Sequence, residues 1–256
     1  MKNDGANPPA PDPKGIVDIN CHILPGADHG AANMKETVEM LRIAYEEGIR
    51  TIVAVSHYGG EYQLTDEEKL EELVCQVQEE AYKIGSDLRI FHGHEIHYSD
   101  DSHEKLMSGE LKSIAGSRYV MVAFPKNIDY KSVRKAVRDV IMEGFIPIVA
   151  HVEQYPDLVT DDVEKIEGLI QRGAYIQITA KSVTGELGHE LKSFAKKLLK
   201  QQLVHFIATE SCDSEDKAPY IKECAEYIER KYGYDYMHEL LTCNPLAVIE
   251  NDDIDI

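Results

Sequence analysis

Residues 146–178 read IPIVAHVEQYPDLVTDDVEKIEGLIQRGAYIQI, and this stretch decides the fold. It begins with a short apolar run, Ile146–Ala150, whose β-branched residues are typical of a buried strand. An amphipathic segment at 161–172 predicts a helix, and Gly173 is the stop that commonly follows a helix. A second apolar run, Ala174–Ile178, follows directly. A strand, a helix and a strand in this order predict a parallel βαβ unit.

The same alternation continues in both directions along the chain. Seven apolar runs predict strands, at Ile16–Asn20, Thr51–Val55, Leu88–His92, Tyr119–Ala123, Ile146–Ala150, Ala174–Ile178 and Leu203–Ala208. Amphipathic stretches predict helices at 34–47, 66–84, 130–143, 161–172, 189–201, 217–231 and 234–242. An open doubly wound sheet and a (β/α) barrel both fit this order. Because no Gly-rich phosphate loop follows the first strand, we favour a closed or nearly closed α/β barrel of TIM type.

We expect a flexible tail at residues 1–15 and one barrel domain at residues 16–256. The first 14 residues hold four of the ten prolines and almost no apolar periodicity. No run of 18 apolar residues and no apolar N-terminal segment is present, which predicts a cytoplasmic protein without membrane insertion. A formal net charge of −19 argues against unassisted nucleic-acid binding. Five scattered cysteines are expected to be reduced thiols.

Histidine and carboxylate side chains recur where a predicted strand gives way to a loop. His22, His57, Glu95, His151 and Glu210 follow the first, second, third, fifth and seventh strands. In a barrel the carboxyl ends of the strands meet at one mouth, where active sites lie. Imidazole and carboxylate together suit manganese, iron or zinc. One such histidine is more often a hydrogen-bonded loop residue, but five strand ends carrying these groups predict a shared site.

The segment His92–Tyr98 contains three histidines within seven residues. In a strand, alternation places His92 and His94 on one face and Glu95 and His97 on the other. Only one of these faces can look into a barrel, so the three histidines cannot all be ligands of one site.

Six segments carry a family resemblance. They are IVDINCHILPGADHGAANM (16–34), TIVAVSHY (51–58), GHEIHY (93–98), GFIPIVAHVEQY (144–155), LVHFIATESCDS (203–214) and NPLAVIEN (244–251). Their order and spacing resemble the polymerase-and-histidinol-phosphatase (PHP) superfamily, and within it the bacterial metal-dependent tyrosine phosphatases of capsule and exopolysaccharide operons. The resemblance implies a distorted (β/α)7 barrel whose mouth holds up to three divalent ions, usually manganese or iron. It also implies a phosphotyrosine protein as substrate, such as a partner bacterial tyrosine kinase.

The resemblance assigns roles to residues that match the family motifs. His22, His57, Glu95 and His151 match metal ligands, with Glu95 in the place of a bridging carboxylate. Asp28 falls in the family's Asp-Asp-Gly segment. From the resemblance we expect Glu95, His151 and Asp28 to take part in catalysis.

Several positions depart from the metal-binding pattern of the family. Asn20 stands where the family has the first histidine, and Ala123 stands where it has a ligand carboxylate. Glu210 keeps a carboxylate in place of aspartate but adds a methylene. Cys212 replaces a histidine; it is either a small buried hydrophobe or a thiolate ligand suited to zinc. His29 replaces the second aspartate of the Asp-Asp-Gly segment.

The phosphate-binding pattern is altered as well. Gln154 stands in place of an arginine that contacts phosphate, and Lys217 matches the place of a later arginine. An arginine offers a bidentate, charge-assisted contact that an amide lacks.

Three interpretations therefore stay open from the sequence. The first is a metal-dependent tyrosine phosphatase that holds fewer than three ions at Asn20, His22, His57, Glu95, His151, Glu210 and Cys212, with manganese favoured over iron or zinc. The second is a degenerate pseudophosphatase that binds a partner or a single metal without turnover. The third is a phosphoesterase with a changed metal and substrate, in which His29 and Cys212 form part of a rebuilt site. The sequence does not determine the metal, the substrate or the oligomeric state. A homo-oligomer is one of the possible states.

Overall fold

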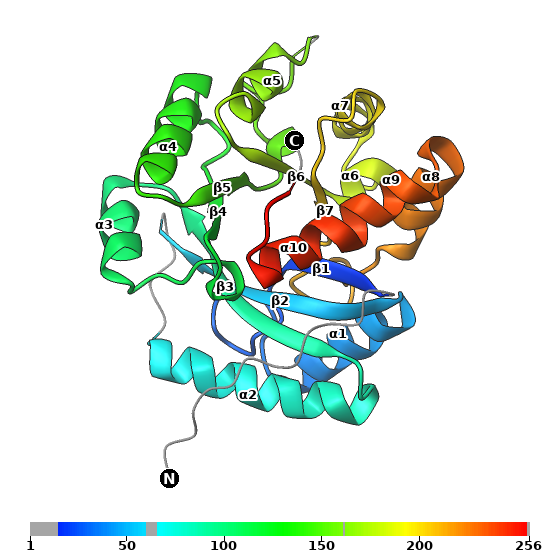
Figure 1. Ribbon diagram of the computed structural model, residues 1–256. Helices are drawn as coiled ribbons and strands as arrows, with labels where there is room; N and C mark the ends of the chain where they lie inside the picture. Colours follow the sequence, from blue (N-terminus) through cyan, green and yellow to red (C-terminus); the bar gives the residue numbers. More distant parts are fainter. Residues whose placement is uncertain (1–14, 60–65, 161, 255–256) are drawn as a thin grey trace.

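The computed structural model describes residues 15–59, 66–160 and 162–254, and the predicted tail at residues 1–14 lies outside the described residues. Seven parallel strands form one sheet in the order of the sequence. They are β1 (Ile16–Cys21), β2 (Ile49–Tyr58), β3 (Arg89–His97), β4 (Tyr119–Ala123), β5 (Ile146–Val149), β6 (Tyr175–Thr179) and β7 (Phe206–Ala208). The sheet curls into a nearly closed barrel with helices outside it, so the predicted barrel is confirmed (Figure 1).

The helices surround the sheet. They are α1 (Met34–Glu46), α2 (Glu67–Ile84), α3 (Asp100–Ser108), α4 (Tyr130–Met142), α5 (Glu164–Ile170), α6 (Ala180–Thr184), α7 (His189–Lys200), α8 (Lys222–Tyr232), α9 (Tyr234–His238) and α10 (Asn244–Glu250). Short 3-10 turns lie at Ile114–Gly116 and Val152–Gln154, and a π-turn at Glu239–Cys243 joins α9 to α10. No helix within the described ranges is both long and apolar enough to cross a membrane.

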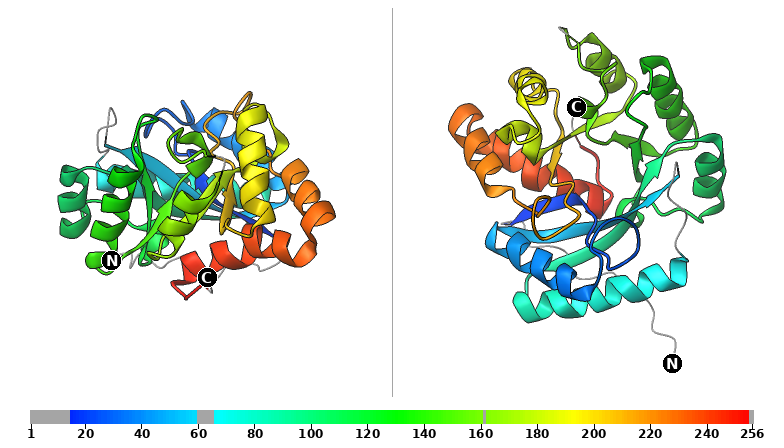
Figure 2. Two further views of the ribbon diagram at one scale, coloured as in Figure 1. Left: turned by 90° about the horizontal axis from the view of Figure 1, so that it is seen from above. Right: turned by 180° about the vertical axis from the view of Figure 1, so that it is seen from behind.

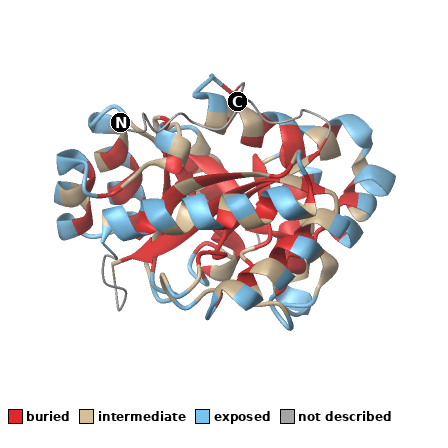
Figure 3. Cartoon of the chain, turned by 90° about the horizontal axis from the view of Figure 1, so that it is seen from below, coloured by how far each residue is buried: buried red, intermediate tan, exposed pale blue. Residues whose placement is uncertain are grey.

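The strands separate two apolar cores by simple alternation. In β4, Val120 and Val122 belong to the core between sheet and helices, whereas Tyr119, Met121 and Ala123 belong to the barrel interior. Both cores are built from residues that are almost fully buried, and the strands are buried while the helices expose one face (Figure 3). Their burial is the main source of the fold's stability.

Main-chain contacts between β1 and the segment after β7 complete the ring. The main chains of Cys21 and Ser211 form an isolated parallel β-bridge, and the amide of Glu210 donates to the carbonyl oxygen of Asn20 at 2.9 Å. The buried Asp18 carboxylate of β1 accepts hydrogen bonds from the amide of Thr209 at 3.0 Å and from its hydroxyl. These contacts fix β1 and β7 side by side at the mouth.

The last helix closes the opposite end of the barrel. Val248 of α10 is fully buried against the interior core, and α10 crosses the barrel opening in Figure 1. Beyond it, the carbonyl oxygens of Asp252 and Ile254 accept hydrogen bonds from the hydroxyls of Tyr119 and Tyr175. Since both tyrosines begin their strands, α10 covers the amino-terminal end and leaves the carboxyl-terminal mouth for chemistry (Figure 2).

Some element bounds differ from the prediction. The third strand continues to His97, well past the predicted end, and α3 was not predicted. The helix predicted at 217–231 begins only at Lys222. Its start is set by the carboxylate of Glu47, which accepts hydrogen bonds from the amides of Ile221 and Lys222 at 2.9 and 2.8 Å. The N-terminus of α8 is therefore capped by Glu47, which follows α1, and not by a residue close to it in the sequence.

Candidate metal centre

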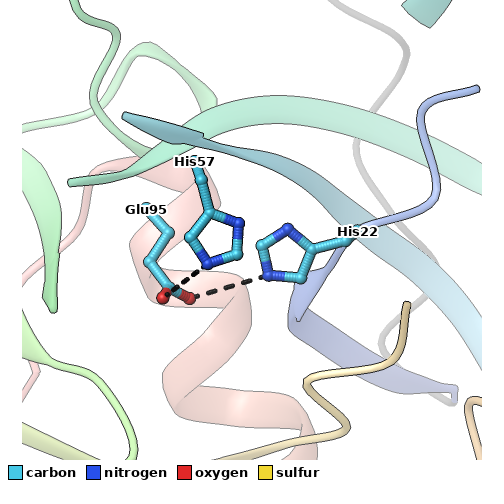
Figure 4. A group of neighbouring side chains, drawn as sticks. All are labelled: His22, His57 and Glu95. Atoms are coloured by element: carbon cyan, nitrogen blue, oxygen red, sulfur yellow. Dashed lines mark ion pairs between the residues drawn. The ribbon is translucent and has the colours of Figure 1, made fainter. Parts of the chain in front are cut away.

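Four predicted ligands meet at the mouth of the barrel. His57 and Glu95 lie near the ends of β2 and β3, while His22 directly follows β1 and His151 is the second residue after β5. The strand register places His57 beside Glu95. All four are at most 8% exposed. The rings of His22 and His57 stack with their centroids 4.0 Å apart, and both face the Glu95 carboxylate (Figure 4).

Glu95 is the centre of this cluster. Its Oε1 lies 3.3 Å from Nε2 of His57 and 3.3 Å from Nε2 of His151, and its Oε2 lies 3.8 Å from Nε2 of His22. Ligand atoms of His22, His57 and Glu95 all lie within 4.8 Å of one another. Of the two faces expected for the segment His92–Tyr98, the face that carries Glu95 is therefore the one directed into the barrel.

Asp28 orients two of the three imidazoles. Its Oδ2 accepts from Nδ1 of His22 at 2.9 Å, from Nδ1 of His57 at 3.0 Å and from the amide of His57 at 3.0 Å. Its Oδ1 accepts from the amide of Gly30 at 2.8 Å, which holds the loop in place. With Nδ1 of both rings engaged, Nε2 of both rings is the nitrogen directed at Glu95. A carboxylate behind a histidine in this way is the usual second contact of a metal-binding imidazole.

The electrostatic field at the cluster favours positive charge. Burial lowers the pKa of His22, but the nearby carboxylates of Asp28 and Glu95 outweigh it and raise this pKa to about 10. Burial likewise opposes the charge on His151, yet the carboxylates of Glu210 and Glu95 raise its pKa to about 9. Although burial disfavours the charged form of Glu95, the surrounding histidines hold its pKa well below the ordinary value.

The donor set fits a divalent transition-metal ion. Among the described residues, Nε2 of His22 is a buried nitrogen that faces the cluster and has no hydrogen-bond partner. An orphaned buried nitrogen is costly unless another group binds it. Three imidazoles with one carboxylate suit manganese, iron or zinc, whereas calcium and magnesium prefer all-oxygen sites.

Strained backbone positions two of the mouth residues. His151 has φ 36° and Glu210 has φ 53°, in the left-handed region that non-glycine residues rarely adopt. Glu153 secures the turn after His151, because its Oε1 accepts hydrogen bonds from the amide and hydroxyl of Thr179 and from the hydroxyl of Ser182 at 2.7–2.9 Å. Strain of this kind is retained mainly at functional sites.

The two amide replacements both bind carboxylates of the site. Nδ2 of Asn20 donates to Oε2 of Glu95 at 2.7 Å, and Nε2 of Gln154 donates to Oε2 of Glu210 at 2.6 Å. Asn20 is fully buried, and among the described residues its Oδ1 has no hydrogen-bond partner. Asn20 therefore lies within the cluster, while Glu210 and Gln154 form a neighbouring pair beside His151.

The remaining predicted residues lie at the rim. Cys212 is 8% exposed, and burial raises the pKa of its thiol while the nearby charge of Lys217 lowers it. Among the described residues, the groups of side chains arranged to hold a metal include none of Cys212, Glu210 and His151, although Nε2 of His151 lies 3.3 Å from Glu95. Lys217 is exposed, and its charge also acts on His29, so its ammonium lies near the mouth. Ala123, at the end of β4, is buried in the barrel interior and offers only a methyl group.

Two histidines widen the site beyond the predicted ligands. The ring of His29 lies 4.5 Å from that of His57, and Asp28, His29 and His57 form a second group whose ligand atoms lie within 4.8 Å of one another. The ring of His97 lies 5.6 Å from that of His57. The alternation of side chains in a strand places His97 on the same face as Glu95, and this pattern could have predicted its position. The position of His29 depends on the conformation of a loop, which the hydrophobic pattern of the sequence does not predict.

Comparison with known proteins finds relatives along nearly the whole chain. The family described as "Capsular polysaccharide synthesis, CpsB/CapC" matches residues 16–250. The tyrosine-protein phosphatase CpsB of Streptococcus pneumoniae is 32% identical over 239 residues, covering 91% of this chain and 98% of that protein. The tyrosine-protein phosphatase YwqE of Bacillus subtilis is 28% identical and covers 93% of both chains. A crystal structure from work on YwqE and CpsB, described as unique metal-dependent tyrosine phosphatases, aligns with a TM-score of 0.86, 28% identity, and coverage of 94% of this chain and 96% of that one.

Proposed function

Since the chain belongs to the CpsB/CapC family of capsular polysaccharide synthesis proteins, we propose that it is a metal-dependent phosphatase that hydrolyses phosphotyrosine on proteins. The observation that carries this proposal is the convergence of three Nε2 atoms on Glu95, with Asp28 fixing two of the rings from behind. The relatives named as tyrosine-protein phosphatases cover nearly the whole chain. A cytoplasmic location and a bacterial tyrosine kinase as substrate are part of the proposal.

We assign His22, His57, His151 and Glu95 as the residues that would hold the metal. A divalent ion in such a site activates water and offsets the charge that develops on the phosphate oxygens. Asp28 acts through His22 and His57, because it keeps Nε2 of both available as ligands. Lys217 matches the place of a family arginine, and its exposed ammonium suits a dianionic substrate.

The number of ions in this proposal is fewer than three. Asn20 offers a neutral oxygen and its amide already donates to Glu95, while Ala123 offers no ligand. Glu210 is held by Gln154. Manganese is the metal we favour, with iron or zinc as alternatives.

A second candidate is a pseudophosphatase that binds without turnover. The observation in its favour is that two amides hydrogen-bond to carboxylates at positions where the family has a histidine and an arginine. These hydrogen bonds satisfy the carboxylates without any ion.

One set of measurements separates the two candidates. The purified chain is stripped with a chelator, reloaded with Mn²⁺, analysed for bound metal by mass spectrometry, and assayed on p-nitrophenyl phosphate and on a phosphotyrosine peptide. Phosphatase activity that requires metal and is lost in Glu95→Ala and His151→Ala supports the enzyme. His103→Ala on α3 is the matched control, since this histidine lies at 3.6 Å from Glu143 and away from the cluster. Absence of both metal and turnover, with an intact circular-dichroism spectrum, would refute the enzyme.

A further inference from the structure

A basic groove lies on the outer surface of α4, beside the end of α5. It is lined by Lys131, Arg134, Lys135, Arg138, Ile141, Met142 and Arg172, and its volume is about 610 Å³. The α4 residues recur at helical spacing and therefore share one face. We call this surface the basic groove.

The charge of the basic groove is opposite to that of the protein as a whole. The chain has a formal net charge of −19, yet five of the seven residues lining the groove are cations, and among the described residues none of the lining residues is acidic. Two carboxylates offset part of this charge: Asp139 lies 3.1 Å from Lys135 and 2.8 Å from Arg138, and Asp100 lies 3.1 Å from Lys135. Arg138 remains 63% exposed. The surplus of positive charge is thus local and open to solvent.

The residues that line the basic groove include two apolar side chains. Met142 is 74% exposed, which is unusual for a large apolar side chain, and Ile141 lies next to it. Arginine side chains also stack on aromatic rings, and Arg134 already lies 5.5 Å from the ring of Tyr130. Cations beside apolar surface suit a ligand that combines negative charge with apolar or aromatic side chains.

The groove begins at the end of the barrel that carries the metal centre. Helix α4 follows β4, whose carboxyl end is at the mouth, so α4 starts there and runs back along the barrel (Figures 1 and 2). A helix of 13 residues is about 20 Å long. About six residues of extended peptide span that length. One substrate segment can therefore lie along α4 while a neighbouring tyrosine reaches the mouth.

We propose that the basic groove docks an acidic segment of the phosphotyrosine protein substrate, next to the phosphotyrosine that is hydrolysed. This inference rests on the proposed function and adds a second contact that raises the local concentration of the substrate. A long nucleic acid fits less well, because its phosphates would extend beyond the groove over an acidic surface. Two copies of this chain each carry a formal net charge of −19, and this overall repulsion disfavours their association through the groove.

The test compares a charge-reversed groove with a matched control. The variant is Arg134→Glu with Arg138→Glu, both exposed on α4. The control is Arg42→Glu with Lys200→Glu, exposed residues of α1 and α7 that change the net charge equally. The probes are a phosphotyrosine peptide with flanking Asp and Glu residues, a peptide of equal length with flanking Ser and Gln, and p-nitrophenyl phosphate.

The variant is expected to raise KM for the acidic peptide about tenfold at low salt, since two attractive charges become repulsive. Its kcat, and its kinetics with the other two probes, are expected to stay at the level of the control. Equal kinetics of variant and control on the acidic peptide, or an equal loss on all three probes, would overturn the inference.

Direct binding keeps this test separate from the proposed function. Fluorescence anisotropy with the labelled acidic peptide is expected to show weaker binding by the variant even if no probe is turned over, a result that would refute only the phosphatase. Binding of single-stranded RNA tighter than the acidic peptide, or an oligomer in sedimentation that the variant dissolves, would replace the proposed occupant and overturn the inference.

Discussion

Substitution of Asp28 by asparagine tests the assignment of the metal centre most directly. The Oδ2 atom of Asp28 accepts three hydrogen bonds, from Nδ1 of His22, Nδ1 of His57 and the amide of His57. Asparagine keeps the shape and one oxygen, which still serves the amide of Gly30. Its NH₂ group, however, then faces three donors. The imidazoles lose their fixed tautomers and their orientation toward Glu95, while the barrel keeps its cores.

The magnitude follows from how much of the donor set Asp28 controls. It contacts two of the four proposed ligands, whereas His151 and Glu95 keep their own contacts. Loss of such a supporting carboxylate typically weakens metal affinity 10–100-fold, or by about 1.4–2.8 kcal/mol. Isothermal titration of the chelator-stripped protein with Mn²⁺ measures this change. The control is Asp129→Asn, which removes the same charge at the N-cap of α4 but keeps a capping oxygen. Metal affinity in Asp28→Asn equal to that of the control would refute the assigned role.

Two further predictions concern acid stability and metal loading. Burial lowers the pKa of His205 to about 4, and its Nδ1 accepts from the amide of Ile176 at 3.0 Å. The unfolded chain takes up this proton near pH 6.5 and the native chain only near pH 4, so up to about 3 kcal/mol of stability is present above pH 6.5 and lost as the pH falls toward 4. In His205→Asn, urea unfolding is expected to show a smaller loss over that range; an unchanged slope would exclude the effect. Replacement of Asn20 by His, Glu210 by Asp and Cys212 by His restores the family's ligand types and is expected to raise the metal-to-protein ratio and the phosphatase rate, whereas an unchanged ratio would show that these positions do not limit metal loading.

The barrel was predictable because its buried strands are short apolar runs separated by amphipathic helices. Prediction was wrong where a strand enters the mouth. The inner face of β3 changes from Phe91 to Glu95 and His97, so its apolar pattern stops while the strand continues. Helix α3 was missed because its sequence DDSHEKLMS buries only Ser102 and Leu106. Its start depends on a capping box in which Ser99 and Ser102 exchange hydrogen bonds. Ser102 stands at the third residue of the helix, where a capping box usually has Glu or Gln, so the sequence indicates this start only weakly.

The candidate site was predictable to the level of residue types at strand ends. In a barrel the carboxyl ends of all strands meet at one mouth. This rule alone predicts that His22, His57, Glu95 and His151 lie close together. Contacts made by loops were not predictable in this way. The link from Asp28 to both imidazoles requires the turn at Gly30, where a Cβ would lie 2.2 Å from the carbonyl oxygen of His22. The basic groove likewise combines α4 with Arg172 from a different segment, which only the packed structure shows.

The two amide replacements explain how this barrel tolerates a reduced set of ligands. A buried carboxylate that loses its cation needs either a proton or hydrogen bonds to remain stable. Asn20 supplies such a bond to Glu95, and Gln154 supplies one to Glu210, each from the position where the family pattern has a larger or charged donor. An amide can stabilise the carboxylate but adds no positive charge, so the histidines beside it stay in a strongly negative field, as the raised pKa of His22 and His151 indicates. Protonation of these two imidazoles offsets part of that negative charge when no ion is bound, and a metal must displace both protons to bind their nitrogens. Metal affinity should therefore rise as the pH increases, and the bound ion would supply the cation that a phosphate dianion needs.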